Sequence, residues 1–446
     1  MKWMLLLKFV LGVIFIRYFD FLSVGIDVAS KVSWAVILGP DHKPASNFIR
    51  IDHSCLDSLN YLVNAVKKAE EVNSLKAKIF LESTGIYHIP LFRHLKEAGF
   101  EVYILNPLIT DSNKNHGIRK VKSDKNDAKR IAKTAYTHDL KVSLIPADLM
   151  LNIRALTRDY HRMVDTKTVF LNQLTKELAL VFPGYSSVFS NTVGKTSRAI
   201  LRTFKTPKMI LETPKYKVIE FISSHAKRGK EAAEKSYKKL INAAKIAITF
   251  SHQLDASYYL IDSKLDMIET IEKRLTDIEN KIKSYLDKYK NEDFVKQIKL
   301  IESITGIGFI TSVTLMAEIG DFKAFRKPKQ LVAYFGVDPC VKESGNFKGT
   351  KISMSKRGSS IARRVLFVVA VAAIRRNNKG EAINPVLREY YEKKLISKSK
   401  KSALGAIMRK MTNIIFAVLR DNKEYEIRTP KEHIKKYNKK LLKIVA

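Results

Sequence analysis

Four acidic residues of this chain lie where carboxylates could act on a phosphodiester. Asp27 interrupts a short apolar run that predicts a β-strand, although Asp is a poor strand former, and Glu82 ends another such run. Asp124 and Asp127 are three residues apart at the start of an expected helix, so both face one side of it. Carboxylates gathered at strand ends would repel one another without divalent cations, and hard oxygen ligands suit Mg²⁺ or Mn²⁺. We therefore expect a metal site on these four residues.

Two such ions, about 4 Å apart, can activate an attacking oxygen and stabilise the leaving one. Each acid also has a structural interpretation. Asp124 could cap the helix, Asp127 could be a favourable acid of its first turn, and Glu82 could pair with a lysine. The four acids in this order favour the metal site over these separate roles.

A basic, glycine-bearing loop at residues 336–364 carries several serines and suggests a second kind of chemistry. A serine hydroxyl can attack a phosphodiester and hold the strand as a phosphoserine if cations neutralise the phosphate. The alternative is that the serines only form turns and caps while the basic residues bind phosphate without covalent chemistry. The cations expected to bind nucleic acid are Lys348, Lys351, Lys356, Arg357, Arg363 and Arg364.

The elements that must position these groups follow from the hydrophobic pattern. Short β-rich runs alternate with helical ones, and the order βββαβαβ followed by a helix predicts an α/β layer. The expected strands are 24–28, 32–38, 48–51, 77–81 and 101–105, and the expected helices are 55–72 and 86–98.

Beyond residue 146 the pattern predicts long helices rich in Lys and Glu. Between Ile261 and Tyr285 apolar residues recur every three or four positions, which indicates a coiled-coil seam able to join two copies of the chain. An ordinary helix packed on its own domain is the alternative. Residues 191–250 are basic and broken by Gly and Pro, and they predict only short helices.

The last third of the chain is expected to be mainly helical. Residues 301–319 resemble a helix-hairpin-helix, in which Gly306 and Gly308 would expose backbone N–H groups to a phosphate, although such a turn also occurs in connections without chemistry. An apolar helix is expected at 361–374, followed by Lys-rich helices. One of them has an amphipathic face of Ile407, Met408, Met411, Ile414, Ile415 and Val418.

Composition limits the class of partner. The 446 residues suggest about three domains, and their net charge of +36 implies a polyanion, most simply nucleic acid and less simply an anionic membrane surface. Cys55 and Cys340 are far apart, so we expect neither a disulfide framework nor a zinc site, and a cytoplasmic setting follows. The apolar run at 4–16 is too short to span a bilayer and precedes no cleavage pattern, so we expect no membrane anchor.

Together these segments resemble the DEDD transposases of bacterial insertion sequences. The segments that carry the resemblance to the first part of that family are Gly25-Ile26-Asp27-Val28-Ala29, Leu81-Glu82-Ser83-Thr84-Gly85-Ile86-Tyr87 and Lys122-Ser123-Asp124-Lys125-Asn126-Asp127-Ala128. Those that resemble the second part are Thr305-Gly306-Ile307-Gly308, Gly336-Val337-Asp338-Pro339, Glu343-Ser344-Gly345 and Ser355-Lys356-Arg357-Gly358. The match in order and spacing covers roughly residues 23 to 376.

The resemblance implies a multidomain α/β plus α protein. Its parts would be a RuvC-like domain of ribonuclease H fold at 23–145, a helical coiled-coil region at 146–296 and a transposase domain with a catalytic serine at 297–376. The apolar extension at 1–22 and the Lys-rich helical extension at 377–446 depart from the family pattern. The metal tetrad falls on Asp27, Glu82, Asp124 and Asp127, and the nucleophile on Ser344, with Ser355 as the alternative.

The function implied is a DNA recombinase that moves its own element. Its partners would be donor and target DNA, an element-encoded bridge RNA that pairs with both, and further copies of the chain in a dimer or tetramer, at the nucleoid. One alternative is a metal-dependent junction resolvase that cleaves with water. Another is a non-catalytic nucleic-acid-binding protein, which would give no reason to place carboxylates against a polyanion; a membrane-surface protein rests only on the N-terminal run.

Overall fold

The computed structural model describes residues 20–82, 87–105, 123–137, 148–226, 229–251, 255–340, 343–344, 347–348, 353–429, 431–432 and 434–435. The chain divides into two compact units, Met1–Ile145 and Pro146–Ala446. The apolar run at 4–16 lies outside the described residues. Phe21 and Leu22, expected to belong to the extension, instead begin the first strand and are buried, so the folded part starts earlier than predicted.

The first unit contains the five-stranded sheet that the alternating pattern predicts. Its strands are β1 Phe21–Asp27, β2 Val32–Leu38, β3 Ile49–Asp52, β4 Lys76–Glu82 and β5 Glu101–Leu105. The order is β3-β2-β1-β4-β5, in which β1, β2 and β3 pair antiparallel while β1, β4 and β5 pair parallel. This mixed sheet is consistent with a ribonuclease H-like DEDD domain.

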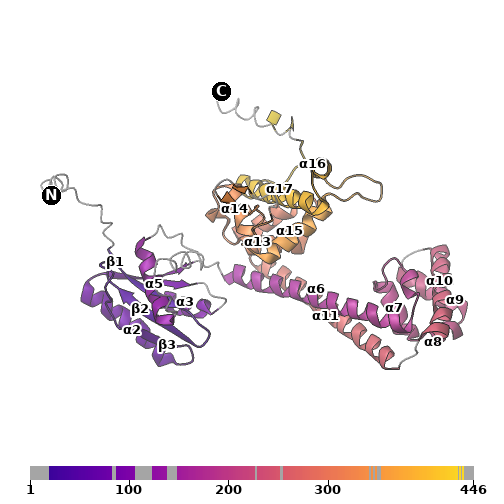
Figure 1. Cartoon of the computed structure of the whole chain (residues 1–446), viewed down its shortest axis with the longest axis horizontal. Helices are drawn as coiled ribbons and strands as arrows, with labels where there is room; N and C mark the ends of the chain where they lie inside the picture. Colours follow the sequence, from indigo (N-terminus) through magenta and orange to yellow (C-terminus); the bar gives the residue numbers. More distant parts are fainter. Residues whose placement is uncertain are drawn as a thin grey trace. The chain divides into compact units, whose positions relative to one another are not determined.

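Helices cover both faces of this sheet (Figure 1). On one face Val24 and Ile26 pack in a core with α2 (Leu56–Asn73) and α3 (His88–Glu97). On the other face lies α5 (Asp124–Thr137), whose apolar side packs on the residues of β1, β2 and β4 that point to this face. Because successive strand residues point to opposite faces, the odd-numbered residues of β1 face α5.

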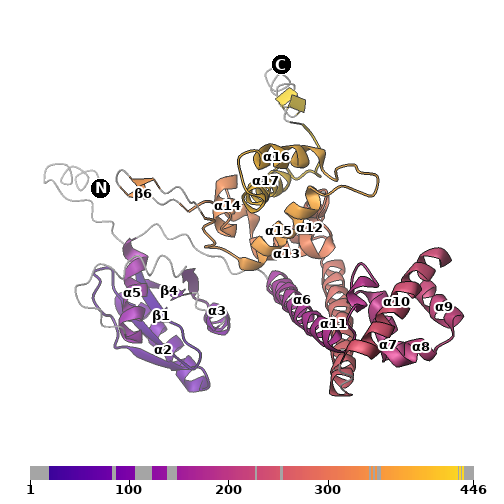
Figure 2. The same ribbon diagram turned by 45° about the vertical axis from the view of Figure 1, so that its right-hand side comes forward.

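The second unit is built on two long helices, α6 (Asp148–Val181) and α11 (Asp255–Lys288), which lie side by side (Figures 1 and 2). They run antiparallel, because the end of α6 and the start of α11 share one hydrophobic core and their opposite ends share another. The apolar seam of α11 is buried inside the chain at Ile261, Leu265, Ile268, Ile271, Leu275, Ile278 and Ile282. The prediction that this seam joins two copies is therefore wrong, and the alternative of a helix packed on its own domain is correct.

A small helical group packs where α6 ends and α11 begins. It consists of η2 Tyr185–Ser187, α7 Lys195–Phe204, α8 Pro207–Glu212, α9 Lys215–Ala226 and α10 Lys230–Phe250. The expectation of only short helices at 191–250 is wrong for α10, which has 21 residues. Its buried residues are mostly alanines. Because alanine is only weakly apolar, the helical repeat of hydrophobic residues is hard to recognise in this segment of the sequence.

The remaining helices pack where α6 begins and α11 ends. They are α12 Asp293–Glu302, α13 Phe309–Ile319, η3 Phe322–Ala324, α14 Pro328–Phe335, α15 Ser360–Ala373, α16 Pro385–Leu395 and α17 Lys400–Asp421, with the two-residue strands β6 Glu343–Ser344 and β7 Phe347–Lys348. Residues 312–319 of α13 are all buried. The predicted face of α17 is confirmed, because it packs in the same core, so residues after 377 contribute helices to this part of the fold.

Within the described residues α17 alone has the length and hydropathy of a membrane span. Its most apolar stretch is 56% buried inside the unit and contacts α12, α14, α15 and α16, as a core helix does.

Candidate active site

Asp27 and Glu82 end two neighbouring parallel strands at the same edge of the sheet. Ile26 of β1 lies opposite Leu81 of β4, so the next residue of each strand continues the same register. Both acids point to the α5 face, because Gly25 and Phe80, two residues earlier, also face α5. The sheet register therefore places these two carboxylates side by side along one edge.

The amino end of α5 is brought to that edge by contacts with β1. Ser23 Oγ donates a hydrogen bond of 2.8 Å to the carbonyl of Ala132. At Gly25 a Cβ atom would lie 2.3 Å from both Ala128 O and Ala132 N, so only glycine permits this approach. As β1 runs from Ser23 towards Asp27, α5 runs back towards its first turn. Asp124 and Asp127 are thus carried to the end of the sheet where Asp27 lies.

The cap of α5 is Ser123 rather than Asp124. Ser123 Oγ accepts a hydrogen bond of 3.3 Å from Asn126 N, and its carbonyl accepts one of 3.0 Å from Asp127 N. Asp124 is then an exposed residue of the first turn, which removes the capping role considered for it. Asp127 is mostly buried, and its Oδ1 lies 2.6 Å from Arg130 Nη2, at ion-pair distance but without hydrogen-bond alignment.

These four acids fit a divalent cation by donor type and by their shared edge and face. All are hard oxygen donors, and the buried Oδ1 of Asp127 has no aligned hydrogen-bond donor. In the conformation described here, no three Asp, Glu, His or Cys side chains among the described residues converge closely enough to hold one ion. The fold thus gathers the acids at one edge without drawing them into a coordination shell.

The second predicted element, the serine loop, lies in the other unit. Ser344 is in β6, paired with Phe347 of β7, and its side chain is outside the described part of the structure, as are the side chain of Lys348 and the whole of Lys351. Ser355 is described: its hydroxyl donates to the carboxylate of Asp338, and its N–H donates to the Asp338 carbonyl at 2.8 Å. Asp338 was not among the predicted site residues.

Residues 353–359 are held tightly against the end of α14. Gly336 has a φ of +65°, and a Cβ there would lie 2.7 Å from Arg357 N. At Gly358 a Cβ would lie 1.7 Å from the Tyr334 carbonyl oxygen. Arg363 donates from Nη1 to the carbonyls of Phe335 (3.1 Å) and Gly358 (2.6 Å). Residues 353–359 are therefore fixed against α14 by these close backbone contacts and by the Arg363 side chain.

The predicted basic residues divide into two groups. Lys356 and Arg357 are exposed and available to a nucleic acid. Arg363 fastens the loop, and Arg364 Nη1 donates to Asp165 of α6 at 2.6 Å, so both are engaged within the chain.

The predicted glycine turn is also present. Gly306 has a φ of +96°, and Gly308 is the N-cap of α13, so no side chain caps the first amides of that helix. Helix, turn and helix follow the predicted order at α12 and α13.

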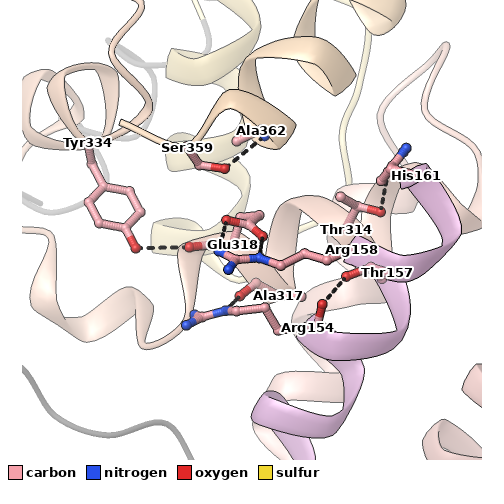
Figure 3. Close-up of polar contacts among 10 residues, drawn as sticks. All are labelled: Arg154, Thr157, Arg158, His161, Thr314, Ala317, Glu318, Tyr334, Ser359 and Ala362. Atoms are coloured by element: carbon pink, nitrogen blue, oxygen red, sulfur yellow. Dashed lines mark hydrogen bonds and ion pairs between the residues drawn. The ribbon is translucent and has the colours of Figure 1, made fainter. Parts of the chain in front are cut away.

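A polar network beside this loop joins α13 and α14 to α6 (Figure 3). Glu318 of α13 is only 3% exposed and accepts hydrogen bonds from Arg158 Nε (2.8 Å) and Nη2 (3.0 Å). Ser359 caps α15 by accepting a hydrogen bond from Ala362 N at 3.1 Å. Burial acts to raise the pKa of Glu318, but the hydrogen bonds from Arg158, the Arg158 and Arg154 charges and the nearby Ser359 hydroxyl together hold that pKa below its usual value.

Sequence reasoning missed this network because its members are 160 residues apart. The available signal was a lone acid in the otherwise uncharged stretch 309–319. A charge on a fully buried helix requires a partner, but the pattern does not say which arginine provides it.

Family models of transposases match two separate segments of the chain. The DEDD transposase model of the IS110 type matches residues 24–183, and the model of the IS116/IS110/IS902 transposase family matches residues 298–392. The 42-kDa protein of insertion element IS900 from Mycobacterium paratuberculosis is 22% identical over 307 residues, which are 68% of this chain and 73% of that protein.

Two further relatives match shorter stretches. The transposase of insertion sequence element IS1111A from Coxiella burnetii is 31% identical over 126 residues, 28% of this chain and 33% of the relative. The pilin gene-inverting protein of Moraxella bovis is 33% identical over 129 residues, 29% of this chain and 38% of the relative.

Proposed function

Since this chain belongs to the IS110 family of DEDD transposases of insertion sequences, we propose that it cuts and rejoins DNA through a serine nucleophile assisted by divalent cations. It is a DNA-recombining enzyme, and its DNA-binding role follows from the family. The observation that carries the proposal is the register of Asp27 with Glu82, together with the docking of α5 that brings Asp124 and Asp127 to the same edge.

The division of labour proposed here is one unit for the carboxylates and the other for the serine. Residues 23–145 would form the RuvC-like domain, 146–296 the helical middle and 297–376 the serine-bearing domain. Asp27, Glu82, Asp124 and Asp127 would hold Mg²⁺ or Mn²⁺, which when bound would neutralise charge on the scissile phosphate. Lys356 and Arg357, which are exposed, and the amides after Gly308 would hold neighbouring phosphates.

The strand exchange requires two displacements at one phosphorus. Ser344 Oγ forms a bond to phosphorus as its proton leaves, and the deoxyribose oxygen departs with a proton as a free hydroxyl. A hydroxyl at another strand end then attacks the phosphoserine, releasing the serine and forming a new phosphodiester. One ester bond forms for each that breaks, so no nucleotide cofactor is consumed.

Ser344 is preferred over Ser355 because Ser355 already has a structural role. Both its hydroxyl and its N–H bind Asp338 and so fasten the loop. A serine whose hydroxyl fastens the fold is less free to reach a phosphate. The expectation is that Ser344→Ala removes the covalent intermediate with little change in stability, whereas Ser355→Ala lowers the melting temperature.

A labelled suicide DNA substrate tests the covalent step. The wild type should retain label after denaturation, Ser344→Ala should retain none, and Ser355→Ala should retain it below its lowered melting temperature. Label lost in Ser355→Ala but not in Ser344→Ala would transfer the nucleophile to Ser355. Full strand cleavage by Ser344→Ala and Ser355→Ala alike would indicate hydrolysis by water, as in a junction resolvase.

A matched pair of variants tests the proposed metal site. Asp27→Asn should lower strand cleavage at least 100-fold while DNA binding persists. Asp57→Asn, an acid in the first turn of α2, should cleave like the wild type. Equal activity of the two variants would contradict the tetrad.

We further propose that an RNA encoded by the element guides the protein and that its active form is an oligomer. The net charge of +36 is enough to bind a second nucleic acid beside the DNA. RNA that copurifies with the protein and hybridises to DNA flanking the reading frame would support guidance. Cleavage that is complete after ribonuclease treatment would contradict it.

A further inference from the structure

Two aromatic rings that share one lysine, Trp34 and Phe48, lie beside the carboxylate edge. Trp34 of β2 is the register partner of Asp27 in the antiparallel pairing of β1 with β2, so the two side chains lie on the same face. Lys125 of α5 places its Nζ 4.5 Å from the centre of the Trp34 ring and 5.9 Å from that of Phe48. All three residues belong to the first unit, and Lys125 directly follows Asp124.

All three residues are at least partly accessible, although Trp34 also packs against the core under α5. Lys125 is exposed, Phe48 is 38% exposed and Trp34 is half-buried. An exposed lysine over an aromatic ring is held weakly, so a stronger partner can displace it at little cost. A phosphate would attract the ammonium, and a nucleobase would take the ring face that the lysine leaves.

We propose that Trp34, Phe48 and Lys125 form a nucleotide-binding platform that positions the DNA strand next to the scissile phosphate. One base stacks on Trp34 and Phe48, and Lys125 moves from the ring to the backbone phosphate of the same nucleotide. The platform rests on the proposed function, because it assumes that the strand to be cut passes the Asp27 edge. It adds a contact by which the first unit holds single-stranded DNA independently of the metal ligands.

The sheet contains a matched control. Lys78 Nζ of β4 lies 4.6 Å from the centre of the Phe21 ring, and both residues are on the α5 face. Lys78 pairs with Ser23, four residues before Asp27, and so lies away from the carboxylate edge. Lys78→Met therefore removes a lysine from a similar ring contact on the same face without touching the platform.

Tryptophan fluorescence reports directly on the proposed contact. The chain has only Trp3 and Trp34, so the full-length Trp3→Phe protein contains Trp34 as its single tryptophan. Titration with single-stranded DNA should quench this emission through stacking, and heparin, a polyanion without bases, should not. Quenching by heparin equal to that by DNA would overturn the stacking contact.

Variants of the platform should separate stacking from charge. Trp34→Leu should weaken binding of a fluorescein-labelled oligonucleotide about tenfold, and Trp34→Phe should restore most of the loss. Lys125→Met should reduce the slope of log affinity against log salt by about 0.7, the value of one phosphate contact on a single strand. Lys78→Met should leave that slope unchanged, and equal slopes for the two lysine variants would overturn the platform.

The outcomes distinguish this inference from the proposed function. Asp27→Asn in the Trp3→Phe protein should lose cleavage but keep the quenching. If cleavage depends on Asp27 but DNA does not quench Trp34, the platform is wrong and the function stands. If DNA quenches Trp34 but Asp27→Asn cleaves normally, the platform stands and the tetrad is wrong. Stronger quenching by RNA of the same sequence would overturn the assignment to DNA.

Discussion

Arg158 on α6 and Glu318 on α13 form a two-bonded ion pair at 2.8 and 3.0 Å. The carboxylate is almost fully buried, whereas the arginine side chain is 48% exposed. The Tyr334 hydroxyl at α14 donates to the backbone carbonyl of Glu318 at 3.0 Å. The buried charge of Glu318 thus helps hold the long helix α6 against α13 and α14, beside the bonds of Arg154 to Ala317 and of Arg364 to Asp165.

Loss of this carboxylate should destabilise the second unit. Glu318→Gln keeps the shape but replaces two charge-assisted hydrogen bonds, so we expect the free energy of unfolding at pH 7 to fall by about 2 kcal/mol. Urea denaturation followed by circular dichroism measures it. The exposed Glu389, paired with Lys393 on one helix, supplies the control Glu389→Gln, whose unfolding midpoint should match the wild type.

The pair of Arg158 and Glu318 also predicts how the free energy of unfolding changes at acid pH. Since the pKa of Glu318 is lowered in the fold from 4.5, its stabilising contribution is complete above pH 4.5 and is lost as the pH falls through the lowered folded pKa. The difference in unfolding free energy between wild type and Glu318→Gln should therefore shrink below about pH 4. If this difference in unfolding free energy stays constant down to pH 2, the ionised pair of Arg158 and Glu318 is not its cause.

Tyr136 predicts that the stability of the first unit falls at alkaline pH. Burial is the main reason that its pKa rises from 10.0 to about 12, and its hydroxyl accepts from Ser23 N at 2.9 Å and contacts the Leu38 carbonyl at 2.9 Å. The protonated Tyr136 hydroxyl therefore stabilises the fold fully below pH 10, and this stabilisation is lost as the pH rises from 10 towards 12. Tyr136→Phe should cost about 2 kcal/mol at pH 8 and less at pH 11. Trp34 emission in the Trp3→Phe protein follows this unit, and exposed Tyr61→Phe is the control.

Gly25 should not tolerate a methyl group. Gly25→Ala would place Cβ against the backbone of α5, where a side-chain rearrangement cannot relieve the clash. We expect a loss of about 3 kcal/mol in the first unit and strand cleavage reduced with it, because α5 carries two of the four acids. Gly229→Ala, at a site in open space with an ordinary φ of −59°, should be neutral. Wild-type urea midpoints for Gly25→Ala would contradict the docking of α5.

Arg130 should compete with a metal ion for Asp127. The guanidinium lies 2.6 Å from Asp127 Oδ1, and a divalent cation on that oxygen must displace it. Arg130→Gln should therefore lower the half-saturating Mn²⁺ concentration about threefold, the equivalent of about 0.6 kcal/mol for a partly exposed ion pair. Isothermal titration calorimetry measures this directly. Weaker Mn²⁺ binding by Arg130→Gln would mean that the arginine supports the metal site instead.

The local pattern was enough to predict most of the elements and the order of the acids. Alternating apolar residues placed all five strands within a few positions, because a strand with one or two buried faces needs that period whatever it packs against. The Gly306 turn and the α17 face were predicted for the same reason. Such features depend on neighbours within a few residues.

Tertiary packing alone decided which partners those elements meet. The α11 seam has the same spacing whether it covers a second copy or α6, and only the antiparallel pairing with α6 shows the latter. Asp338 could be seen as a partner of Ser355, and Arg158 as a partner of Glu318, only after the helices were packed. By itself the sequence determined that four acids, a serine loop and a large positive charge occur together. The register of β1 with β4 and the close approach of α5 at Gly25 decided which acids share an edge, because contacts between distant residues depend on how whole elements pack.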